Sequence, residues 1–197
     1  MTEVAAVRIL PAAARAALPW KNGGGLTREV AIHPPGSDLG TFEWRVSIAQ
    51  VRAAGPFSSF PGVDRQLAVL AGELALVIAD AVPRTLTPET PPLAFPGEVA
   101  ASAMPVSAEV TDLNVMTRRG HVAARLARHA VNRSLSVDPR TGSILLLALS
   151  PLRLHQAALE WPLAPLDAAL LGRASRCELR PQAVPGEAYL IELFSDP

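Results

Sequence analysis

The sequence has few of the residues that metal and covalent chemistry require. Cys177 is the only cysteine, so an internal disulfide is impossible and nothing calls for an oxidising compartment. We interpret Cys177 as a buried structural thiol in a strand. The four histidines are isolated from one another, whereas a metal site in a β protein usually has two histidines two residues apart on one strand. We therefore predict no metal and no cofactor.

Motifs for nucleophilic catalysis and for phosphate binding are also missing. No Gly-x-Ser-x-Gly or paired cysteine and histidine motif occurs, so acyl transfer is unsupported and we predict no catalytic residue of this kind. Gly23-Gly24-Gly25 precedes a strand rather than a helix, which excludes a phosphate-cradling loop. The glycines are expected to permit unusual backbone angles or the close approach of a ligand.

Long apolar runs and an excess charge of one sign are absent as well. The longest apolar run, around Ile144–Leu149, is far shorter than the roughly 20 residues that cross a bilayer. Glu3, Arg8 and Arg15 make the N-terminus a poor signal peptide, so we place the protein in the cytoplasm. Because 18 basic residues balance 18 acidic ones, we predict neither nucleic acid nor a membrane as a partner.

Proline, glycine and alternating apolar residues are abundant instead. Nineteen prolines and 13 glycines are spread along the chain, which favours short strands and turns over long helices. The clearest strand is Phe42–Val51, where Phe42, Trp44, Val46 and Ile48 alternate with polar residues. In 26–33, Thr27 and Glu29 alternate with Leu26, Arg28, Val30 and Ile32.

About a dozen such strands without a βαβ rhythm indicate an all-β, jelly-roll barrel with at most one or two short helices. The segment Pro165–Leu171 is the best candidate for a short helix. The runs Gln66–Leu70 and Leu74–Ile78 are expected to form a hairpin around Gly72. We expect one compact unit over 1–197, with about 1–120 and 121–197 as candidate pseudo-repeated halves.

Polar side chains lie among apolar neighbours in the first 120 residues. Several arginines that can pair with carboxylates, together with Lys21, the only lysine, favour a pocket for a small anion. Aromatic residues, among which Phe60 is the better ligand contact and Trp44 the better core residue, are expected to wall it. The predicted binding residues are Trp20, Lys21, Asn22, Arg28, Glu29, Arg45, Ser47, Phe60, Asp64, Arg65, Asp112, Asn114 and Arg118. Alternatively, Arg28–Glu29 and Asp64–Arg65 form internal ion pairs.

Three dense motifs resemble those of the HutD/Ves family. They are the segments Pro19–Glu29, Phe42–Ala49 and Gly55–Arg65, and Asp112–Arg119 is similar to a further motif of that family. The resemblance implies a cupin-type jelly roll of two fused halves that lacks the usual cupin metal ligands. It also implies a role in histidine utilisation through a bound intermediate such as urocanate or a formyl- or formimino-glutamate, although some members are described only as stress-induced.

Three hypotheses about function remain open. In the first, a metal-independent binding protein, either a monomer or a homodimer, holds a small anionic metabolite. Arg45 and Arg28 clamp the carboxylate of the metabolite, and Lys21 adds a positive charge. Asn22 and Asn114 orient the metabolite. In the second, a metal-free isomerase or hydrolase uses Glu29 or Asp64 as general base. In the third, a stress-related module acts through its surface on another protein.

Overall fold

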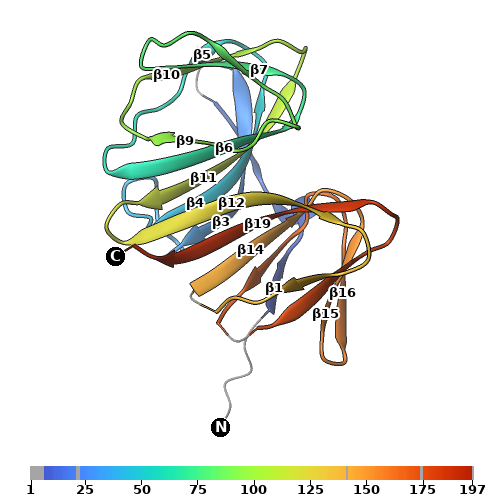
Figure 1. Cartoon of the computed structure of the whole chain (residues 1–197). Coiled ribbons are helices and arrows are strands. Elements are labelled where there is room, and N and C mark those ends of the chain that lie inside the picture. The colour runs from blue at the N-terminus through green and yellow to red at the C-terminus, as the bar shows by residue number, and fades with distance from the viewer. Residues whose placement is uncertain (1–6, 21–22, 141, 174, 197) are drawn as a thin grey trace. The chain divides into compact units, whose positions relative to one another are not determined.

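The regular secondary structure of the chain consists almost entirely of antiparallel strands, as a computed structural model of it shows (Figure 1). The structure describes residues 7–20, 23–140, 142–173 and 175–196. They divide into two compact units: an N-terminal unit of 16–123 with 196, and a C-terminal unit of 7–15 with 124–195. The all-β prediction is confirmed. Within these described ranges, no helix is long and apolar enough to span a bilayer.

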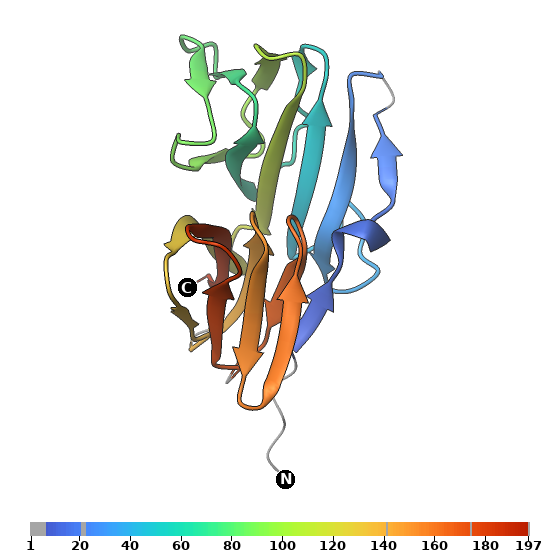
Figure 2. The same cartoon turned by 90° about the vertical axis from the view of Figure 1, so that its right-hand side faces the viewer.

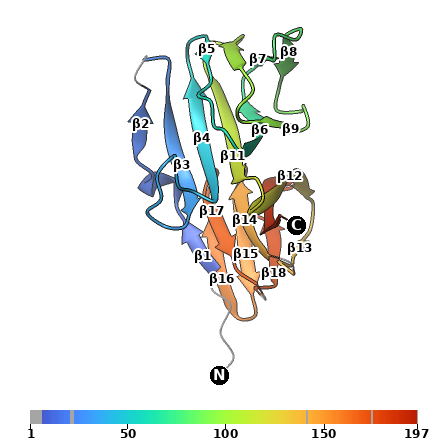
Figure 3. The same cartoon turned by 90° about the vertical axis from the view of Figure 1, so that its left-hand side faces the viewer.

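The N-terminal unit contains a six-stranded and a four-stranded sheet. In spatial order, the six strands are β2 (Ala17–Pro19), β3 (Gly25–His33), β4 (Trp44–Val51), β11 (Val110–Arg118), β6 (Val63–Ala71) and β9 (Leu93–Pro96). The four strands are β5 (Gly55–Pro56), β10 (Ala101–Pro105), β7 (Leu74–Ile78) and β8 (Arg84–Leu86). Figure 3 shows β2, β3, β4 and β11 side by side.

The C-terminal unit is also built from two sheets. Its five-stranded sheet has the order β1 (Val7–Leu10), β17 (Ala168–Leu171), β14 (Gly142–Ala148), β19 (Gly186–Ser195) and β12 (Val122–Val131). Its four-stranded sheet has the order β13 (Leu135–Val137), β18 (Cys177–Pro181), β15 (Leu152–Gln156) and β16 (Leu159–Leu163). The β15–β16 hairpin is orange in Figure 2. A short 3₁₀ turn, Ala12–Ala14, follows β1.

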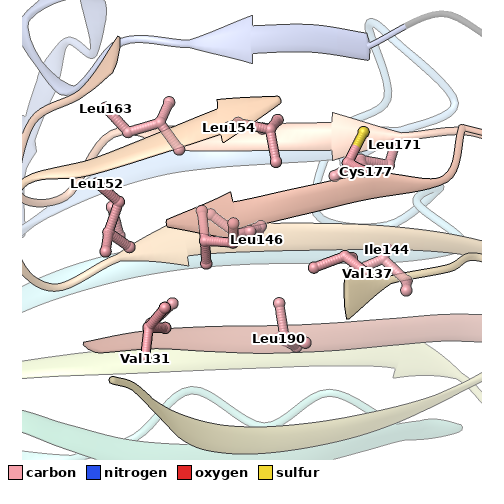
Figure 4. Packing of buried hydrophobic residues seen from close by; sticks show 14 residues of the cluster. Val131, Val137, Ile144, Leu146, Leu152, Leu154, Leu163, Leu171, Cys177 and Leu190 are labelled. Carbon is pink, nitrogen blue, oxygen red and sulfur yellow. The ribbon is translucent and has the colours of Figure 1, made fainter. Parts of the chain in front are cut away.

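Apolar side chains fill the interior of the C-terminal unit. The buried cluster contains Ile144 and Leu146 of β14, Leu154 of β15, and Cys177 of β18, as Figure 4 shows. A fully buried leucine contributes about 1.5–3 kcal/mol to folding through the hydrophobic effect. The free thiol of Cys177 is buried in this cluster, as expected.

The helix predicted over Pro165–Leu171 is wrong. Residues Ala168–Leu171 form β17, which pairs with both β1 and β14. A central strand that is buried on both faces has a continuous apolar sequence, which periodicity alone does not distinguish from a short buried helix. The chain enters this strand through Leu166, whose φ of 68° lies in the left-handed region.

The predicted hairpin around Gly72 is also wrong. β6 pairs with β11 and β9, whereas β7 pairs with β10 and β8, so the turn carries the chain from one sheet to the other. Gly72 has a φ of +79°, and a Cβ there would lie 2.6 Å from the carbonyl oxygen of Glu109. Glycine therefore permits this tight sheet-to-sheet connection.

Candidate ligand-binding cavity

Alternating side chains of β4, β11 and β6 form three rows on one face of the six-stranded sheet. In the first row, Met116 of β11 lies opposite Arg45 of β4 and Arg65 of β6. The next row has Asn114 opposite Ser47 and Leu67, and the third has Asp112 opposite Ala49 and Val69. Because residues paired across strands project to the same face, strand register alone gathers these polar groups inside the N-terminal unit.

These rows line a cavity of about 650 Å³. Its polar lining residues are Thr27, Arg45, Ser47, Ser58, Arg65, Asp112 and Asn114. Its apolar lining includes Trp20, Phe57, Phe60 and Met116. Leu18 and Leu39 also line it and are 57% and 54% exposed, so the cavity opens to solvent. A mostly apolar hollow with a few convergent polar groups is typical of small-molecule sites.

The glycine-rich turn after Trp20 fixes one aromatic wall. The Trp20 backbone N–H donates to the Gly25 carbonyl (2.9 Å), and the indole Nε1 donates to Thr27 Oγ1 (2.8 Å). A Cβ on Gly25 would lie 2.3 Å from the Gln50 carbonyl oxygen and 3.1 Å from the Trp20 ring. Gly25 thus allows a close approach, but of protein groups rather than of the ligand that the sequence predicted. The predicted unusual backbone angle is present at Gly23, whose φ is +71°.

The loop after β5 supplies the second aromatic wall. The backbone N–H of Phe57 donates to the Ala101 carbonyl (2.8 Å), and that of Phe60 donates to the Gly97 carbonyl (2.9 Å). These two bonds fasten the loop to β10 and to the turn after β9. Phe57 and Phe60 therefore border the cavity at fixed positions rather than on a free loop.

Arg65 is a buried cation held between two aromatic rings. Its guanidinium carbon lies 4.7 Å from the centroid of Phe57 and 5.1 Å from that of Phe95, distances at which the ring faces attract a cation. Burial lowers the pKa of Arg65 to about 10, with nearby Asp112 raising it and Arg45 lowering it. Arg65 remains charged at neutral pH.

A chain of hydrogen bonds leads from Arg65 to a buried carboxyl group. Arg65 Nη2 donates to Asn114 Oδ1 (2.6 Å), and Asn114 Nδ2 donates to Asp112 Oδ1 (2.6 Å). Asp112 is only 1% exposed. Burial raises its pKa to about 7, against the smaller lowering effects of Asn114 and Arg65.

Arg45 is the second cation of the cavity. Its Nε donates to Glu29 Oε2 (2.9 Å), and its Nη1 lies 3.4 Å from Ser47 Oγ. Arg45 is buried, whereas the Glu29 side chain is 38% exposed. The cavity therefore contains two guanidinium groups. Arg45 bonds directly to the partly exposed carboxylate of Glu29, whereas Arg65 is linked to Asp112 through the amide of Asn114.

Several predicted binding residues lie away from the cavity. Arg28 projects to the opposite face of β3, where it pairs with Ile48 and its Nη1 donates to Gln50 Oε1 (3.1 Å). Asp64 accepts from Arg119 Nη2 (2.6 Å) on the surface. Arg118 donates to the carbonyls of Phe42 (3.0 Å) and Gly40 (2.9 Å).

Most of the other predicted residues line the cavity or reach it through a neighbour. Trp20, Arg45, Ser47, Phe60, Arg65, Asp112 and Asn114 line the cavity, and Glu29 reaches it through Arg45. Lys21 and Asn22 lie outside the described residues. The expected ion pairs Arg28–Glu29 and Asp64–Arg65 do not form. Instead, Glu29 pairs with Arg45, and Asp64 pairs with Arg119. Trp44 is buried, as expected for a core residue, and stacks on His33 at 5.7 Å.

Sequence reasoning missed Thr27, Ser58, Met116 and Phe95. Thr27 alternates with Glu29, and Met116 with Asn114, so a period of two could have placed both beside predicted residues. Phe95 gave no such signal, because its place over Arg65 depends on the pairing of β9 with β6. Among the described residues, no three His, Cys, Asp or Glu side chains cluster as metal ligands would.

A family model described as HutD matches residues 12–188. The chain belongs to the HutD family. This confirms the resemblance seen in the sequence motifs. The HutD-family chain is 38% identical over 109 residues to Protein Ves of Citrobacter koseri, covering 54% of this chain and 56% of that protein. It is 37% identical over 110 residues to an uncharacterised 21.2 kDa protein of the hutC 3′ region of Pseudomonas putida, covering 55% and 57%. The chain thus spans just over half the length of these curated relatives.

Solved structures agree with this assignment. The HutD structure from Pseudomonas fluorescens SBW25 is similar at a TM-score of 0.82 and 27% identity, covering 96% of this chain and 99% of that one. A cupin 2 conserved barrel domain protein from Leptotrichia buccalis is similar at a TM-score of 0.58 and 10% identity, covering 85% and 88%. At that identity only the fold is shared, and the cupin-type fold that the resemblance implied is confirmed.

Proposed function

We propose that this HutD-family protein binds a small anionic metabolite in the cavity of the N-terminal unit, without a metal, and thereby modulates histidine utilisation. The metabolite is a carboxylate of the urocanate or formyl- or formimino-glutamate type. The observation that carries the proposal is the convergence of Arg45 and Arg65 in one aromatic-walled cavity of about 650 Å³. That volume suits a compound of this size.

Charge and geometry both support an anion. Guanidinium groups bind carboxylates through charge-assisted hydrogen bonds, which are strongest where water is excluded. Arg65 already contacts Phe57, Phe95 and Asn114, so we expect it to lose little further side-chain entropy when a ligand binds. The relative from the hutC 3′ region and the HutD structure support a connection to histidine utilisation.

Titration calorimetry with urocanate, N-formyl-L-glutamate and formimino-L-glutamate tests the proposal. We expect saturable binding of at least one compound by the wild type. Arg45→Ala should weaken it at least about tenfold, because a hydrogen bond to a charged group contributes about 1.5–3 kcal/mol. Arg52→Ala is the matched control, since Arg52 pairs with Glu109 at an exposed position outside the cavity.

The outcomes separate binding from catalysis. No heat with any of the three compounds would contradict the binding proposal, as would equal losses of affinity in Arg45→Ala and Arg52→Ala. NMR spectra of each compound with the protein show whether new product signals arise. Product formation would favour the metal-free enzyme, for which Glu29 and Asp64 were the expected bases; both are held by arginines.

A further inference from the structure

Asp112 is the most buried ionisable residue that lines the cavity, and its hydrogen bonding to the described residues is incomplete. Its Oδ1 accepts from Asn114, but its Oδ2 is buried and accepts no hydrogen bond from any described residue. Arg65 Nε is buried as well, and no described residue accepts a hydrogen bond from it. The nearest cation therefore reaches Asp112 only through the amide of Asn114. A buried carboxylate in this position is poorly stabilised.

The ionisable groups of the cavity come from four strands. Asp112 of β11 shares the lining with two cations, Arg65 of β6 and Arg45 of β4. Glu29 of β3 joins this set as the ion-pair partner of Arg45. With Asp112 ionised, the two cations and two anions of this set cancel. With Asp112 protonated, the set carries one net positive charge. Among these described groups, protonation of Asp112 gives the cavity a net positive charge that attracts an anion.

We propose that an anion and a proton enter this cavity together, the proton being bound by Asp112. This inference rests on the proposed function and concerns the same site. An anion beside Arg45 and Arg65 takes over the charge compensation that Asp112 supplies in the free protein. Two like charges in one buried cavity disfavour each other, so a bound anion favours the neutral carboxylic acid.

Linkage fixes the sign of the pH dependence. The pKa of Asp112 is about 7 in the free protein, and a bound anion raises it further. The liganded protein therefore binds more protons than the free protein around neutral pH, and affinity falls as the pH rises. For a bound-state pKa at least two units higher, the dissociation constant increases roughly tenfold between pH 6 and pH 8.

Calorimetry with N-formyl-L-glutamate at pH 6 and pH 8 tests the coupling. Its carboxyl groups are ionised throughout this range, so the probe does not titrate. Measurements in two buffers of different ionisation enthalpy give the number of protons taken up. We expect proton uptake at pH 7 and roughly tenfold weaker binding at pH 8 in the wild type.

Asp112→Asn keeps the shape and the acceptor for Asn114 but cannot take up a proton. We expect this variant to bind with nearly the same affinity at both pH values and without proton uptake. Asp138→Asn is the matched control, because Asp138 pairs with Arg140 in the C-terminal unit, and it should retain the wild-type pH dependence. Thermal unfolding verifies that both variants are folded.

Each outcome is decisive. Wild-type binding with equal affinity at both pH values and no proton uptake overturns the coupling but leaves the proposed function intact. No binding at either pH overturns both for this ligand. If Asp112→Asn is unfolded, ¹³C NMR of the wild-type Asp112 carboxyl group decides: an upward shift of its titration midpoint on ligand addition supports the coupling, and an unchanged midpoint overturns it.

Discussion

Each of the two units contains two sheets, but different kinds of side chain fill their interiors. On β4 of the N-terminal unit, the inward-facing residues are Arg45, Ser47 and Ala49. On β14 of the C-terminal unit, the buried cluster contains Ile144, Leu146 and Ala148. Strands of similar length in the middle of a sheet therefore support either an open cavity with convergent polar groups or a filled apolar core, and the choice depends on every second residue.

The difference also affects stability. Apolar residues in the C-terminal core contribute through burial and close packing. Asp112 and Arg65, in contrast, lose hydration on folding, and hydrogen bonds through Asn114 offset only part of that loss. The N-terminal unit retains its polar interior at a cost in stability, which is expected where a site serves binding.

The largest expected effect is the pH dependence that Asp112 imposes on stability. Its folded-state pKa of about 7 lies above that of an unfolded aspartate, so the unfolded chain loses the proton first as the pH rises. The free energy of unfolding should decrease by about 4 kcal/mol from pH 4 to pH 8 through this group, with most of the decrease below pH 7.

Urea denaturation of the wild type and of Asp112→Asn between pH 4 and pH 8 measures this contribution. The variant lacks the carboxyl group, so its stability relative to the wild type should increase across pH 4 to 8, mostly below pH 7. Parallel stability curves for the two proteins would show that Asp112 is ionised at ordinary pH, and the contrast between the units would weaken.

Truncating a core side chain of the C-terminal unit should change the free energy of unfolding slightly less than the titration of Asp112 does. Leu146 is fully buried in the cluster, and Leu146→Ala should lower the free energy of unfolding by about 3 kcal/mol through lost contacts and a cavity. Leu159→Ala, at a position that is 57% exposed on β16, is the control and should cost far less. Similar losses in both variants, measured by urea denaturation, would contradict the description of a tightly filled interior.

The smallest expected effect is a difference between the two interiors in how fast a thiol is alkylated. Burial raises the pKa of the Cys177 thiol to about 11, and the thiolate is the reactive form. Alkylation of native Cys177 at pH 8 should therefore be at least about 100-fold slower than in the denatured chain. Ser58→Cys in a Cys177→Ala background introduces a thiol at the cavity, where we expect rapid alkylation. Equal native rates at both positions would remove the distinction between closed and open interiors.

Much of the cavity could be predicted from local sequence. Arg45 and Ser47 on one strand, and Asp112 and Asn114 on another, lie two residues apart, and side chains two apart share a face. Arg28 and Glu29 show the limit. Alternation placed them on opposite faces, but only the pairing of Arg28 with Ile48 shows that Arg28 faces away from the cavity.

Irregular pairing also changed one alternation pattern. The register of β3 against β4 shifts between Glu29 and Ala31. After this shift Ile32 pairs with Arg45 and lies on the same face as Glu29, although simple alternation assigned Ile32 to the face of Arg28. A bulge adds one residue to one strand, so the parity of every later residue changes. Nothing in the local sequence marked its position.

The sequence by itself determined an all-β chain, the faces of its clearest strands and, through its motifs, its family. These features depend on short-range periodicity and on residue identity. Only the tertiary structure decided that Arg65 lies between Phe57 and Phe95, that Asp64 pairs with Arg119, and that 168–171 is a strand. Each of these depends on partners distant in sequence, whose positions follow from strand order and register rather than from neighbouring residues.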